Sequence, residues 1–500
     1  MSQERTEERA MTLARMEKRQ EPPVRTAEVL IVGCGAAGLL AAVSAGELGL
    51  SCMALERRHR TGLKLLMCGN NRCNVSHDAD VSEMLAAYGG AMAEFLRPAL
   101  TRFPPRGLRS WFARNGLGTC VKNGRIYPTT ENGDDVLHCF TDRLRDLGVP
   151  LTLNCPVTGL EPLPDGGWLV RCGGLSLTAT CVLLATGGVS YPKTGSVGDG
   201  QRLLSELGVE VTPLRAGLAG VDVRDGWLQA PEKCEFLQVV LTVADASGRV
   251  LGQTSGNMLC DRGCLRGTAV FDATRLAAHH GVTEVSLTAD LCPGVTSASA
   301  VASRLASGGL ESLGVPSALA AGLRRALPSR EVGRWLKAVP LSVAGVRPLK
   351  EAIVTVGGVA LGEVNPETME LRSHPGLYVA GELLDVDGPT GGYNLHAAFA
   401  TARLAIQSMA ARGDIACRRP EARPVPQERG ARRVERERGV PSSASSSARP
   451  RSSCDRRPGN RWDNSELTRK WSRDGGGSPE RQGQQQPSGG HGKGGRKERW

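Results

Sequence analysis

The sequence predicts an α/β protein with more than one domain, and three observations lead to this prediction. The chain has 500 residues, several times the size of a usual domain. Its 63 Gly and 40% hydrophobic residues, with only 4% aromatics, suit a fold with many tight turns and exclude a collagen or a coiled coil. Residues 28–56 also have the pattern of a strand, a glycine-rich turn, a helix and a second strand.

The first of these elements form a dinucleotide-binding pattern. Glu28–Val32 is a β-branched apolar run, typical of a buried parallel strand. Leu39–Leu48 is an apolar, Ala-rich helix, and Ser51–Leu55 is a second strand that is followed by Glu56. The turn after the first strand has the spacing GxGxxG and contains Gly33, Gly35, Ala36, Ala37 and Gly38.

Each residue type in this turn has a physical reason. Gly33 allows the tight turn, Gly35 lets the backbone approach a pyrophosphate, and Gly38 lets the helix pack against the sheet. The helix N-terminus offers unpaired N–H groups and a partial positive charge to the phosphates. Glu56 is placed to accept hydrogen bonds from the ribose hydroxyls, and its charge would repel a 2′-phosphate. The motif therefore predicts FAD or NAD rather than NADP.

Two distant strands favour FAD. Thr180–Ala185 reads as a buried strand that runs into a Thr-Gly-Gly turn, and Gly376–Val379 as another that runs into Ala-Gly-Glu. In two-site FAD enzymes, strands with such turns complete the Rossmann sheet. An apolar helix at Leu395–Ala411 follows, and its N-terminus would face the flavin pyrimidine edge, where negative charge collects on reduction.

From Ala27 to about Gly413 the chain resembles the BaiN-like, aminoacetone-oxidase-type family of FAD-dependent NAD(P)/FAD oxidoreductases. The matching segments are AEVLIVGCGAAGLLAA, LKLLMCGNNRCNVSH, NGRIYPTTENGDDVL, VLLATGGVSYPKTGSVGDGQRLLSELG, VTVGGVALGEVNPETME and GLYVAGELLDVDGPTGGYNLHAAFA. The last segment is the most specific. The resemblance implies bound FAD in a Rossmann-like, glutathione-reductase-like domain, with an inserted β-barrel-like domain and a small helical domain.

The resemblance also implies the domain order. We expect a charged extension at 1–26, the first part of the FAD-binding domain at 27–205, an inserted substrate domain at 206–344, the second FAD-binding part at 345–413 and a tail at 418–500. Strand-like runs at Gly220–Val250 and Glu284–Asp290, and short helices at Ser297–Leu336, agree with a β-rich insert that carries a helical subdomain at about 297–336.

The family's cofactor-binding positions carry over residue by residue. Gly33, Gly35, Gly38 and Glu56 are expected to hold the adenosine diphosphate. Residues after the acid are expected near the pyrophosphate and isoalloxazine, and the middle and final turns complete the site. These further positions are Lys64, Arg72, Cys73, Asn74, Thr186, Gly187, Gly188, Gly381, Glu382, Asp385, Asp387, Gly391, Gly392, Tyr393 and Asn394.

Three departures from the family pattern stand out. Asn71 replaces a glycine before Arg-Cys-Asn, and Asn tolerates a positive φ. His396 replaces a common Gln and would alter the charge beside the flavin. Leu259–Val270 lacks the family's Thr-His and Ser-Gly-Pro pattern, and because this stretch is expected beside the substrate pocket, the departure would affect substrate choice or activity.

The resemblance suggests an FAD-dependent oxidoreductase of a small organic molecule, which reduces a C=C bond or oxidises an amine through flavin N5. The sequence has no second GxGxxG unit, so NADH or NADPH would bind only transiently as a donor. Tyr191 and Lys193, after the middle turn, are either donors to a substrate oxyanion or simple loop residues. No catalytic residue and no metal ligand is assigned.

Two cysteine patterns offer alternatives. Cys68 and Cys73 have the spacing and position of the redox disulfide in flavin disulfide reductases, which is a second mechanistic hypothesis. Cys260 and Cys264, with His279 and His280 beyond, match no strong zinc pattern, so we expect no zinc site there.

The net charge of +11 lies in the tail. Residues 418–500 contain 21 Lys/Arg and 10 Asp/Glu, whereas residues 1–417 contain 41 of each. The tail is rich in Ser, Gly, Pro and Gln, so we expect it to be disordered. A non-catalytic FAD-stabilised protein that binds RNA or a partner through this tail is the remaining alternative.

Cellular location follows from what the sequence lacks. The first 25 residues are charged and have no apolar h-region, and the 15 Cys show no secretory context, so we expect a cytoplasmic protein. The apolar runs are far shorter than the ~20 residues of a membrane span, so no membrane contact is expected. The oligomeric state is not predicted.

Overall fold

The computed structural model describes residues 25–69, 71–230 and 232–415. The predictions for the extension before residue 25 and for the tail from residue 418 lie outside the described residues. Within the described ranges, no helix is long and apolar enough to cross a membrane.

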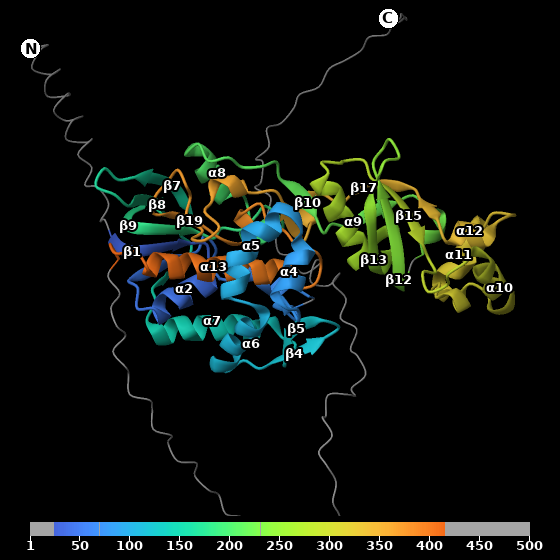
Figure 1. Cartoon of the computed structure of the whole chain (residues 1–500), viewed down its shortest axis with the longest axis horizontal. Helices are drawn as coiled ribbons and strands as arrows, with labels where there is room; N and C mark the ends of the chain where they lie inside the picture. Colours follow the sequence, from blue (N-terminus) through green and yellow to red (C-terminus); the bar gives the residue numbers. More distant parts are fainter. Residues whose placement is uncertain (1–24, 70, 231, 416–500) are drawn as a thin grey trace, which may run out of the picture. The chain divides into compact units, whose positions relative to one another are not determined.

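The main sheet is seven-stranded and mostly parallel (Figure 1). Its order is β6-β2-β1-β9-β8-β7, and β19 pairs with the end of β9. Strands β1, β2, β6, β9 and β19 run parallel, whereas β7 and β8 form an antiparallel extension. The strands are β1 Arg25–Val32, β2 Cys52–Leu55, β6 Leu151–Thr152, β7 Val157–Pro162, β8 Trp168–Cys172, β9 Leu175–Leu184 and β19 Leu377–Val379.

The register of these strands aligns their carboxyl ends. Val32 of β1 pairs with both Leu55 of β2 and Leu184 of β9, and Val379 of β19 also pairs with Leu184. In parallel α/β sheets, ligands bind at the carboxyl ends of the strands. The turns that follow β1, β2, β9 and β19 are therefore gathered at one edge, as the sequence analysis predicted for FAD.

Two apolar helices cover one face of the sheet. Helix α2 (Ala36–Glu47) is buried on nearly all sides because it consists almost entirely of Ala, Leu, Val and Gly. Helix α13 (Tyr393–Ala410) packs against α2, and in Figure 1 both lie below β1. The predicted helices began at Leu39 and Leu395; the real ones begin earlier because their first turns follow glycine N-caps at Gly35 and Gly392.

Further helices and a small sheet lie on the outer side of α2 and α13. Helix α5 packs on α13 and helix α7 packs on α2. The helices are α3 Leu63–Met67, α4 Val81–Tyr88, α5 Gly90–Arg102, α6 Pro105–Arg114, α7 Gly133–Leu147 and α8 Asp199–Glu206. The small antiparallel sheet contains β3 Ser76–His77, β4 Thr119–Lys122 and β5 Arg125–Pro128.

The inserted segment builds a second, antiparallel sheet of order β16-β15-β12-β13-β14-β11-β17. Its two edge strands, β16 and β17, are joined by the single residue Ser342, so the sheet curls until its edges approach, in a barrel-like arrangement. The strands are β11 Val221–Val223, β12 Cys234–Ala244, β13 Val250–Asp261, β14 Cys264–Arg266, β15 Ser286–Asp290, β16 Val339–Leu341 and β17 Val343–Val346.

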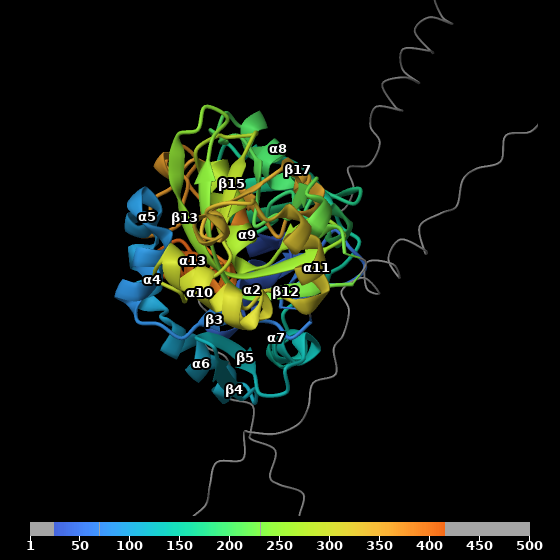
Figure 2. The same ribbon diagram turned by 90° about the vertical axis from the view of Figure 1, so that its right-hand side faces the viewer.

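Helix α9 (Thr268–His279) packs on β12, β13 and β14 and also on β10 (Arg215–Gly217), which pairs with β18 (Val354–Val356). Figure 2 looks onto this inserted part, with α9 seen among its strands. Three short helices follow in the segment where the sequence predicted them: α10 Ala298–Gly308, α11 Ser317–Ala326 and α12 Val332–Leu336.

The buried apolar residues form two separate clusters. One cluster draws on residues 29–209 and 359–415 and lies around the parallel sheet. The other draws on residues 221–341 and lies around the antiparallel sheet. The domain boundaries given above stay predictions, but the two cores divide the described chain between the two sheets.

Candidate functional site

The three glycine turns predicted from distant segments are in contact. A Cβ added to Gly33, whose φ is +93°, would lie 2.6 Å from the Ala185 carbonyl oxygen. A Cβ added to Gly381, whose φ is +73°, would lie 2.9 Å from the Ala37 Cβ. Only glycine fits both the dihedral angle and the space. The turns after β1, β9 and β19 therefore meet at the start of α2.

The turn between β1 and α2 has one closed and one open side. A Cβ on Gly38 would lie 1.7 Å from the Gly33 carbonyl oxygen, whereas a Cβ on Gly35 would meet nothing within 4 Å. Gly35 is the N-cap of α2, and no side chain caps the helix. The first N–H groups of α2, with Ala36 and Ala37, thus face open space beside Gly35. This is the geometry that a pyrophosphate needs.

Glu56 lies at the end of β2 and is only 7% exposed. Its Oε2 accepts a hydrogen bond from the Cys34 N–H at 2.9 Å, and its Oε1 accepts one from the Arg58 N–H at 2.8 Å. Burial raises the pKa of Glu56, while these two hydrogen bonds and the nearby arginines oppose the rise. Each carboxylate oxygen keeps a second lone pair for a ribose hydroxyl.

Lys64 and Glu382 come from segments 318 residues apart and form an ion pair. Lys64 Nζ lies 2.5 Å from Glu382 Oε2 and donates to Ser190 Oγ at 2.6 Å. Glu382 Oε1 accepts from the Thr355 N–H at 2.9 Å and from the Ser190 hydroxyl at 3.3 Å. Sequence reasoning missed Ser190 and Thr355; the position of Ser190, two residues after the middle turn, was the available signal.

The middle turn packs against this network. Gly187 has a φ of +75°, and its carbonyl accepts from Gln201 Nε2 at 3.1 Å. A Cβ on Gly188 would lie 2.3 Å from Thr355 Oγ1. The Thr186 hydroxyl oxygen is buried and has no hydrogen-bond partner among the described residues. Such an orphaned group calls for a ligand or water.

The residues of the Arg-Cys-Asn segment differ in their surroundings. Asn71 has the positive φ, +65°, that its replacement of glycine required. Cys73 is fully buried with a φ of +54°, and the buried Asn74 Oδ1 has no partner among the described residues. The Arg72 guanidinium instead lies over the Tyr127 ring, 5.2 Å from its centroid, and 3.6 Å from Glu131.

Asp387 contacts the inserted part of the chain. Its Oδ1 accepts hydrogen bonds from Arg275 Nε and lies 2.9 Å from His279 Nε2, and Arg275 also donates to its backbone carbonyl at 2.8 Å. Its side chain is fully buried, and Oδ2 has no partner among the described residues. Helix α9 thus holds the loop that the sequence predicts to bind the cofactor. Nearby, Asp385 Oδ2 accepts from the Thr212 hydroxyl at 2.9 Å.

The residues that open α13 brace the loop. The Asn394 side chain accepts from the Gly388 N–H at 2.8 Å and donates to the Gly388 carbonyl at 2.9 Å. The Tyr393 ring stacks on His77, which also contacts the Gly391 carbonyl at 3.1 Å. A Cβ on Gly392 would lie 2.4 Å from the Ser76 carbonyl oxygen. The roles of these residues toward a cofactor stay predictions.

His396 does not change the charge of the site. It is fully buried in α13, where its ring contacts Ser76 Oγ at 3.0 Å and the Phe103 carbonyl at 2.9 Å. Burial lowers the pKa of His396 to about 4. The ring is therefore neutral near pH 7, and the altered charge expected from this departure does not arise.

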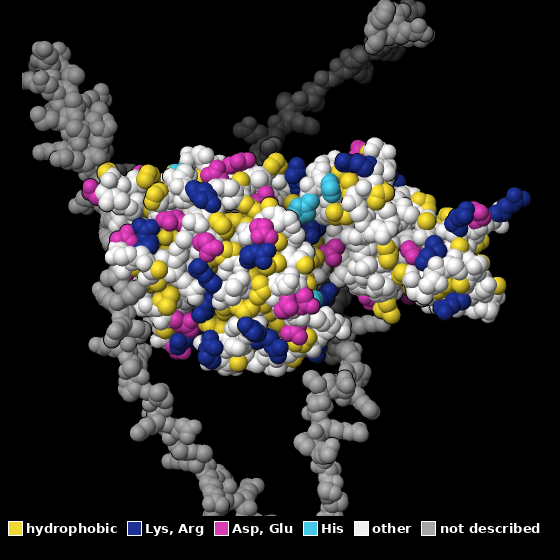
Figure 3. All heavy atoms as spheres, in the orientation of Figure 1, with side chains coloured by type: hydrophobic (Ala, Val, Ile, Leu, Met, Phe, Trp, Pro, Cys, Tyr) yellow, Lys and Arg dark blue, Asp and Glu magenta, His cyan; other side chains and the backbone are white. Residues whose placement is uncertain are grey.

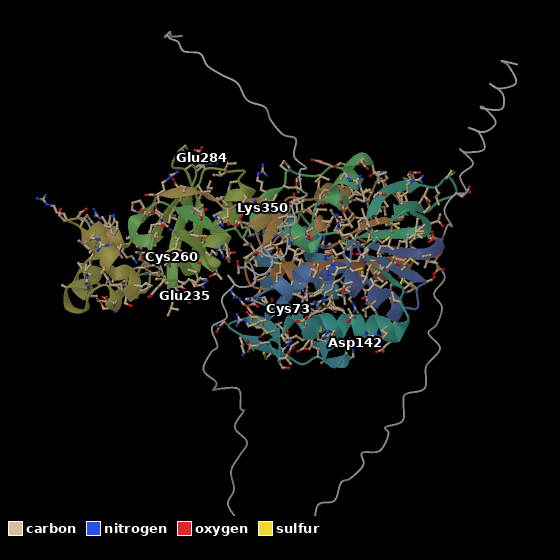
Figure 4. All side chains as sticks on the ribbon, turned by 180° about the vertical axis from the view of Figure 1, so that it is seen from behind. Cys73, Asp142, Glu235, Cys260, Glu284 and Lys350 are labelled. Atoms are coloured by element: carbon tan, nitrogen blue, oxygen red, sulfur yellow. The ribbon has the colours of Figure 1, made fainter. Side chains whose placement is uncertain are left out.

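The cysteine pair of the alternative mechanism is shielded. Cys73 is fully buried and Cys68 is partly buried, and both are free thiols. Burial raises the pKa of Cys68 to about 11 and that of Cys73 well above its ordinary value, which opposes thiolate formation. Cys260 lies in the inserted sheet, apart from Cys73 (Figure 4), and no metal-binding cluster of His, Cys, Asp or Glu occurs within the described ranges.

A shallow apolar groove lies elsewhere, between α4 and α5. Its lining includes Val81, Leu85, Ala93, Glu94 and Arg97. Figure 3 shows hydrophobic side chains at the surface over these two helices. None of its lining residues belongs to the glycine turns.

The residues at the carboxyl ends of the strands fit FAD. Helices α2, α8 and α13 all begin at glycine N-caps without a side-chain cap, so their first N–H groups remain available. Buried Thr186 and Asn74 oxygens lack partners, and the Gly35 side of the turn is open. Glu56 and the start of α2 suit the adenosine diphosphate half of the molecule.

Comparisons with known proteins agree with this geometry. The family model described as HI0933-like protein Rossmann domain matches residues 27–408. The chain is 30% identical over 411 residues to a 3-dehydro-bile acid delta(4,6)-reductase of Clostridium scindens, covering 76% of this chain and 98% of the relative. It is 24% identical over 400 residues to a ribosomal RNA dihydrouridine synthase of Escherichia coli, covering 77% and 98%.

One similar solved structure comes from the comparison of folds. It is the 3-ketosteroid-delta4-(5alpha)-dehydrogenase of Rhodococcus jostii, with 15% sequence identity and a TM-score of 0.46. The similarity covers 79% of this chain and 99% of that chain.

Proposed function

The chain belongs to the HI0933-like Rossmann family, a family of FAD-dependent oxidoreductases, and on that premise we propose that it reduces a carbon–carbon double bond conjugated to a carbonyl group. The electrons would come from NADH or NADPH, bound transiently. FAD supplies hydride transfer through its ring when bound. The protein's own part is to hold the cofactor, to place the substrate and to move a proton.

The reactions named for the relatives support the choice of C=C reduction for this chain. One relative reduces a 3-dehydro-bile acid at its delta(4,6) positions, and two others make dihydrouridine in ribosomal RNA. Both names describe the addition of two hydrogens across a ring double bond near a carbonyl. This shared chemistry favours C=C reduction over the amine oxidation that the sequence left open.

The site offers groups for the cofactor half of this task. The open N-terminus of α2 would bind the pyrophosphate, and Glu56 the adenosine ribose. The Lys64–Glu382 pair, fixed by Ser190 and Thr355, would hold the middle of the cofactor between the first and third turns. The substrate would then lie between these turns and the inserted part, which Arg275 and His279 join to the Asp387 loop.

Two substrate classes follow from the relatives. A polycyclic enone acid is favoured by the relative with the higher identity, 30%. A uridine base in RNA is favoured by the two dihydrouridine synthases and by the net charge of +11 in residues 418–500. Both classes present a double bond conjugated to a carbonyl, so one experiment separates them.

The test is an anaerobic two-step reaction with the purified full-length protein. First, NADH or NADPH should bleach the visible flavin absorbance. Then a 3-oxo-delta(4,6) bile acid, a uridine-containing RNA and a saturated 3-oxo bile acid are added to separate portions of reduced protein. We expect one of the first two to restore the colour and to yield a product with two more hydrogens, while the saturated ketone leaves the protein reduced.

Other outcomes would count against the proposal. A colourless protein that does not take up added FAD contradicts flavin chemistry altogether. If a primary amine bleaches the oxidised protein, and neither unsaturated compound reoxidises the reduced one, the amine oxidase reading replaces ours. If a disulfide substrate is reduced, and the Cys68→Ser variant no longer reduces it, the flavin disulfide alternative is right.

A further inference from the structure

The segment from the middle of α5 to the loop before α7 has an uneven charge. Residues 95–130 contain seven Lys/Arg and no Asp/Glu, although residues 1–417 are neutral as a whole. The seven are Arg97, Arg102, Arg106, Arg109, Arg114, Lys122 and Arg125. A group of cations on one surface raises the local concentration of anionic partners. The function of the segment therefore depends on whether these side chains lie together.

Helix α6 separates its apolar and basic residues onto opposite sides. The buried side consists of Pro105, Leu108, Trp111 and Phe112. On the other side Arg106 and Arg114 are exposed, and Arg109 is partly exposed. Figure 3 shows Lys and Arg side chains at the surface over α6. Three arginines and no acid thus face outward from one helix.

Aromatic packing fixes the position of α6. The Trp111 ring stacks on Phe140 of α7, with centroids 5.2 Å apart, and the Phe112 ring packs edge-on against Phe399 of α13 at 6.4 Å. The large apolar residues of α6 are all buried in this way, so none is left to enter a lipid bilayer. A helix that binds at a membrane surface needs such an exposed apolar face. The outward side of α6 is suited instead to a hydrophilic polyanion.

The cations of this region are only partly neutralised. Arg106 and Arg114 form no ion pair with a described carboxylate. Lys122, at the end of β4, shares Glu131 with Arg72. The outward surface of α6 and of the β4–β5 hairpin therefore keeps a net positive charge.

The hairpin connects α6 to the candidate cofactor site. Arg109 Nε donates to Thr119 Oγ1 of β4 at 3.2 Å, and in Figures 1 and 2 α6, β4 and β5 lie side by side. Arg125 of β5 pairs with His77 of β3, whose ring contacts the Gly391 carbonyl at 3.1 Å. The basic segment thus extends from α6 to the turn that opens α13, where the flavin is expected.

We infer that this basic face binds the phosphate backbone of RNA. The basic face consists of Arg106, Arg109 and Arg114 on α6 and Lys122 and Arg125 on the β4–β5 hairpin. The inference rests on the proposed function with a uridine in RNA as the substrate. An enzyme that acts on one base must hold the backbone around it while the base leaves the stack. A row of cations can contact successive phosphates, whereas the single carboxylate of a bile acid needs only one.

The first test measures RNA binding by the full-length protein. A fluorescently labelled, uridine-rich single-stranded RNA is titrated at several salt concentrations, and its anisotropy is recorded. The double variant Arg106→Gln/Arg114→Gln should bind the RNA about 10-fold more weakly at about 0.1 M salt, with a salt dependence reduced by about one to two phosphate contacts. Arg106→Lys/Arg114→Lys should bind as the natural chain does, because Lys also contacts phosphate.

The matched control changes two arginines of the inserted part. Arg325 and Arg330 are exposed and form no ion pair with a described carboxylate. Arg325→Gln/Arg330→Gln has the same net charge as Arg106→Gln/Arg114→Gln but leaves the basic face intact. Its RNA affinity and salt dependence should equal those of the natural chain.

The second test maps the contact, because residues 418–500 also carry positive charge. The RNA is crosslinked to the full-length protein by ultraviolet light, and the crosslinked peptides are identified by mass spectrometry. We expect crosslinks within residues 105–128, which contain α6 and the hairpin, and their loss in Arg106→Gln/Arg114→Gln.

Several outcomes would overturn the inference. One is equal RNA affinity in Arg106→Gln/Arg114→Gln and in the Arg325→Gln/Arg330→Gln control, and another is crosslinking confined to residues 418–500. A third is a double variant that keeps its RNA affinity but no longer sediments with vesicles of phosphatidylglycerol and phosphatidylcholine, which would assign the basic face to a membrane.

These outcomes are distinct from the fate of the proposed function. If the natural chain reduces the bile acid and binds no RNA, the inference fails while the proposed reduction stands. If the RNA binds to the basic face and neither unsaturated compound is reduced, the proposed function fails while the docking surface stands.

Discussion

Burial determines the protonation state of a titratable residue in the core of this protein. His396 illustrates the point, since it replaces a residue that is usually uncharged and would be expected to add charge. Full burial instead keeps its ring neutral, and Ser76 and the Phe103 carbonyl satisfy both ring nitrogens. A neutral imidazole donates a hydrogen bond at one nitrogen and accepts one at the other, as a buried amide side chain does with its N–H and carbonyl groups.

The low pKa of His396 predicts a loss of stability in acid. Its folded pKa of about 4 lies below the ordinary 6.5, so its contribution is complete above pH 6.5 and is lost as the pH falls toward 4. At about 1.4 kcal/mol per pH unit, about 3 kcal/mol of the free energy of unfolding disappears over that range. His396→Gln should remove this part of the pH dependence because Gln can contact the same two partners.

The measurement is urea unfolding, followed by tryptophan fluorescence, at pH 7 and at pH 4.5. His138→Gln, at an exposed position on α7, is the matched control and should keep the natural pH dependence. An equal loss of stability in His396→Gln and in the natural chain would show that other groups cause it.

At the scale of the element, two glycines in the turn between β1 and α2 have different roles, one in folding and one expected in cofactor binding. Gly38 faces the Gly33 carbonyl, where an added Cβ has no room, and so Gly38 is needed for the fold. Gly35 has a φ of −78°, which any residue adopts, and its Cβ would point into open space. No residue in the part of the chain that the structure describes requires glycine at 35, so we expect the requirement to come from a bound pyrophosphate.

This difference gives a paired prediction. Gly38→Ala should destabilise the protein by about 3 kcal/mol or more, because a Cβ 1.7 Å from a carbonyl oxygen forces α2 away from the sheet. Gly35→Ala should leave the melting temperature of the FAD-free protein unchanged but weaken FAD binding at least about 10-fold, by blocking close approach to the pyrophosphate. Calorimetric titration with FAD and thermal unfolding of the stripped protein measure the two effects. Equal FAD affinity in Gly35→Ala and the natural chain would place the pyrophosphate elsewhere.

At the scale of the molecule, helix α9 connects the inserted antiparallel sheet to the Rossmann part, which is the part of the chain built around the parallel sheet. Besides the Arg275 and His279 contacts to Asp387, Asp272 of α9 accepts a hydrogen bond from the Thr390 N–H at 2.8 Å. These contacts lie along one face of α9 and hold both ends of the 387–390 loop. A change in the inserted part can thus reach the loop that opens α13.

Breaking this connection should be costly. Arg275→Met leaves the fully buried Asp387 carboxylate with only His279 beside it, so we expect a loss of about 3–5 kcal/mol in the free energy of unfolding. The double variant Arg275→Met/Asp387→Asn should recover much of that loss because no buried charge remains unpaired. Arg324→Met, which breaks an exposed pair with Glu311, is the control and should cost less than about 1 kcal/mol. If Arg275→Met lowers the free energy of unfolding no more than Arg324→Met does, water already solvates the Asp387 carboxylate.

Much of the Rossmann part could be predicted from the sequence. The strand at 28–32, the GxGxxG turn, the helix after it and the two distant strand-and-turn segments are local patterns, and each shows itself within about ten residues. The prediction that the two distant strands join the same sheet is confirmed by the pairing of β9 with β1 and of β19 with β9. Helices α4–α7 and the small sheet carried no such pattern and were not predicted.

The sequence by itself determined where the chain turns tightly and where an acid follows a strand, because backbone conformation and apolar periodicity act over short distances. Only the tertiary structure decided that Lys64 meets Glu382 and that Asp387 is held by Arg275. Each of these pairs joins segments that are at least 112 residues apart, and no local pattern of the sequence brings such segments together.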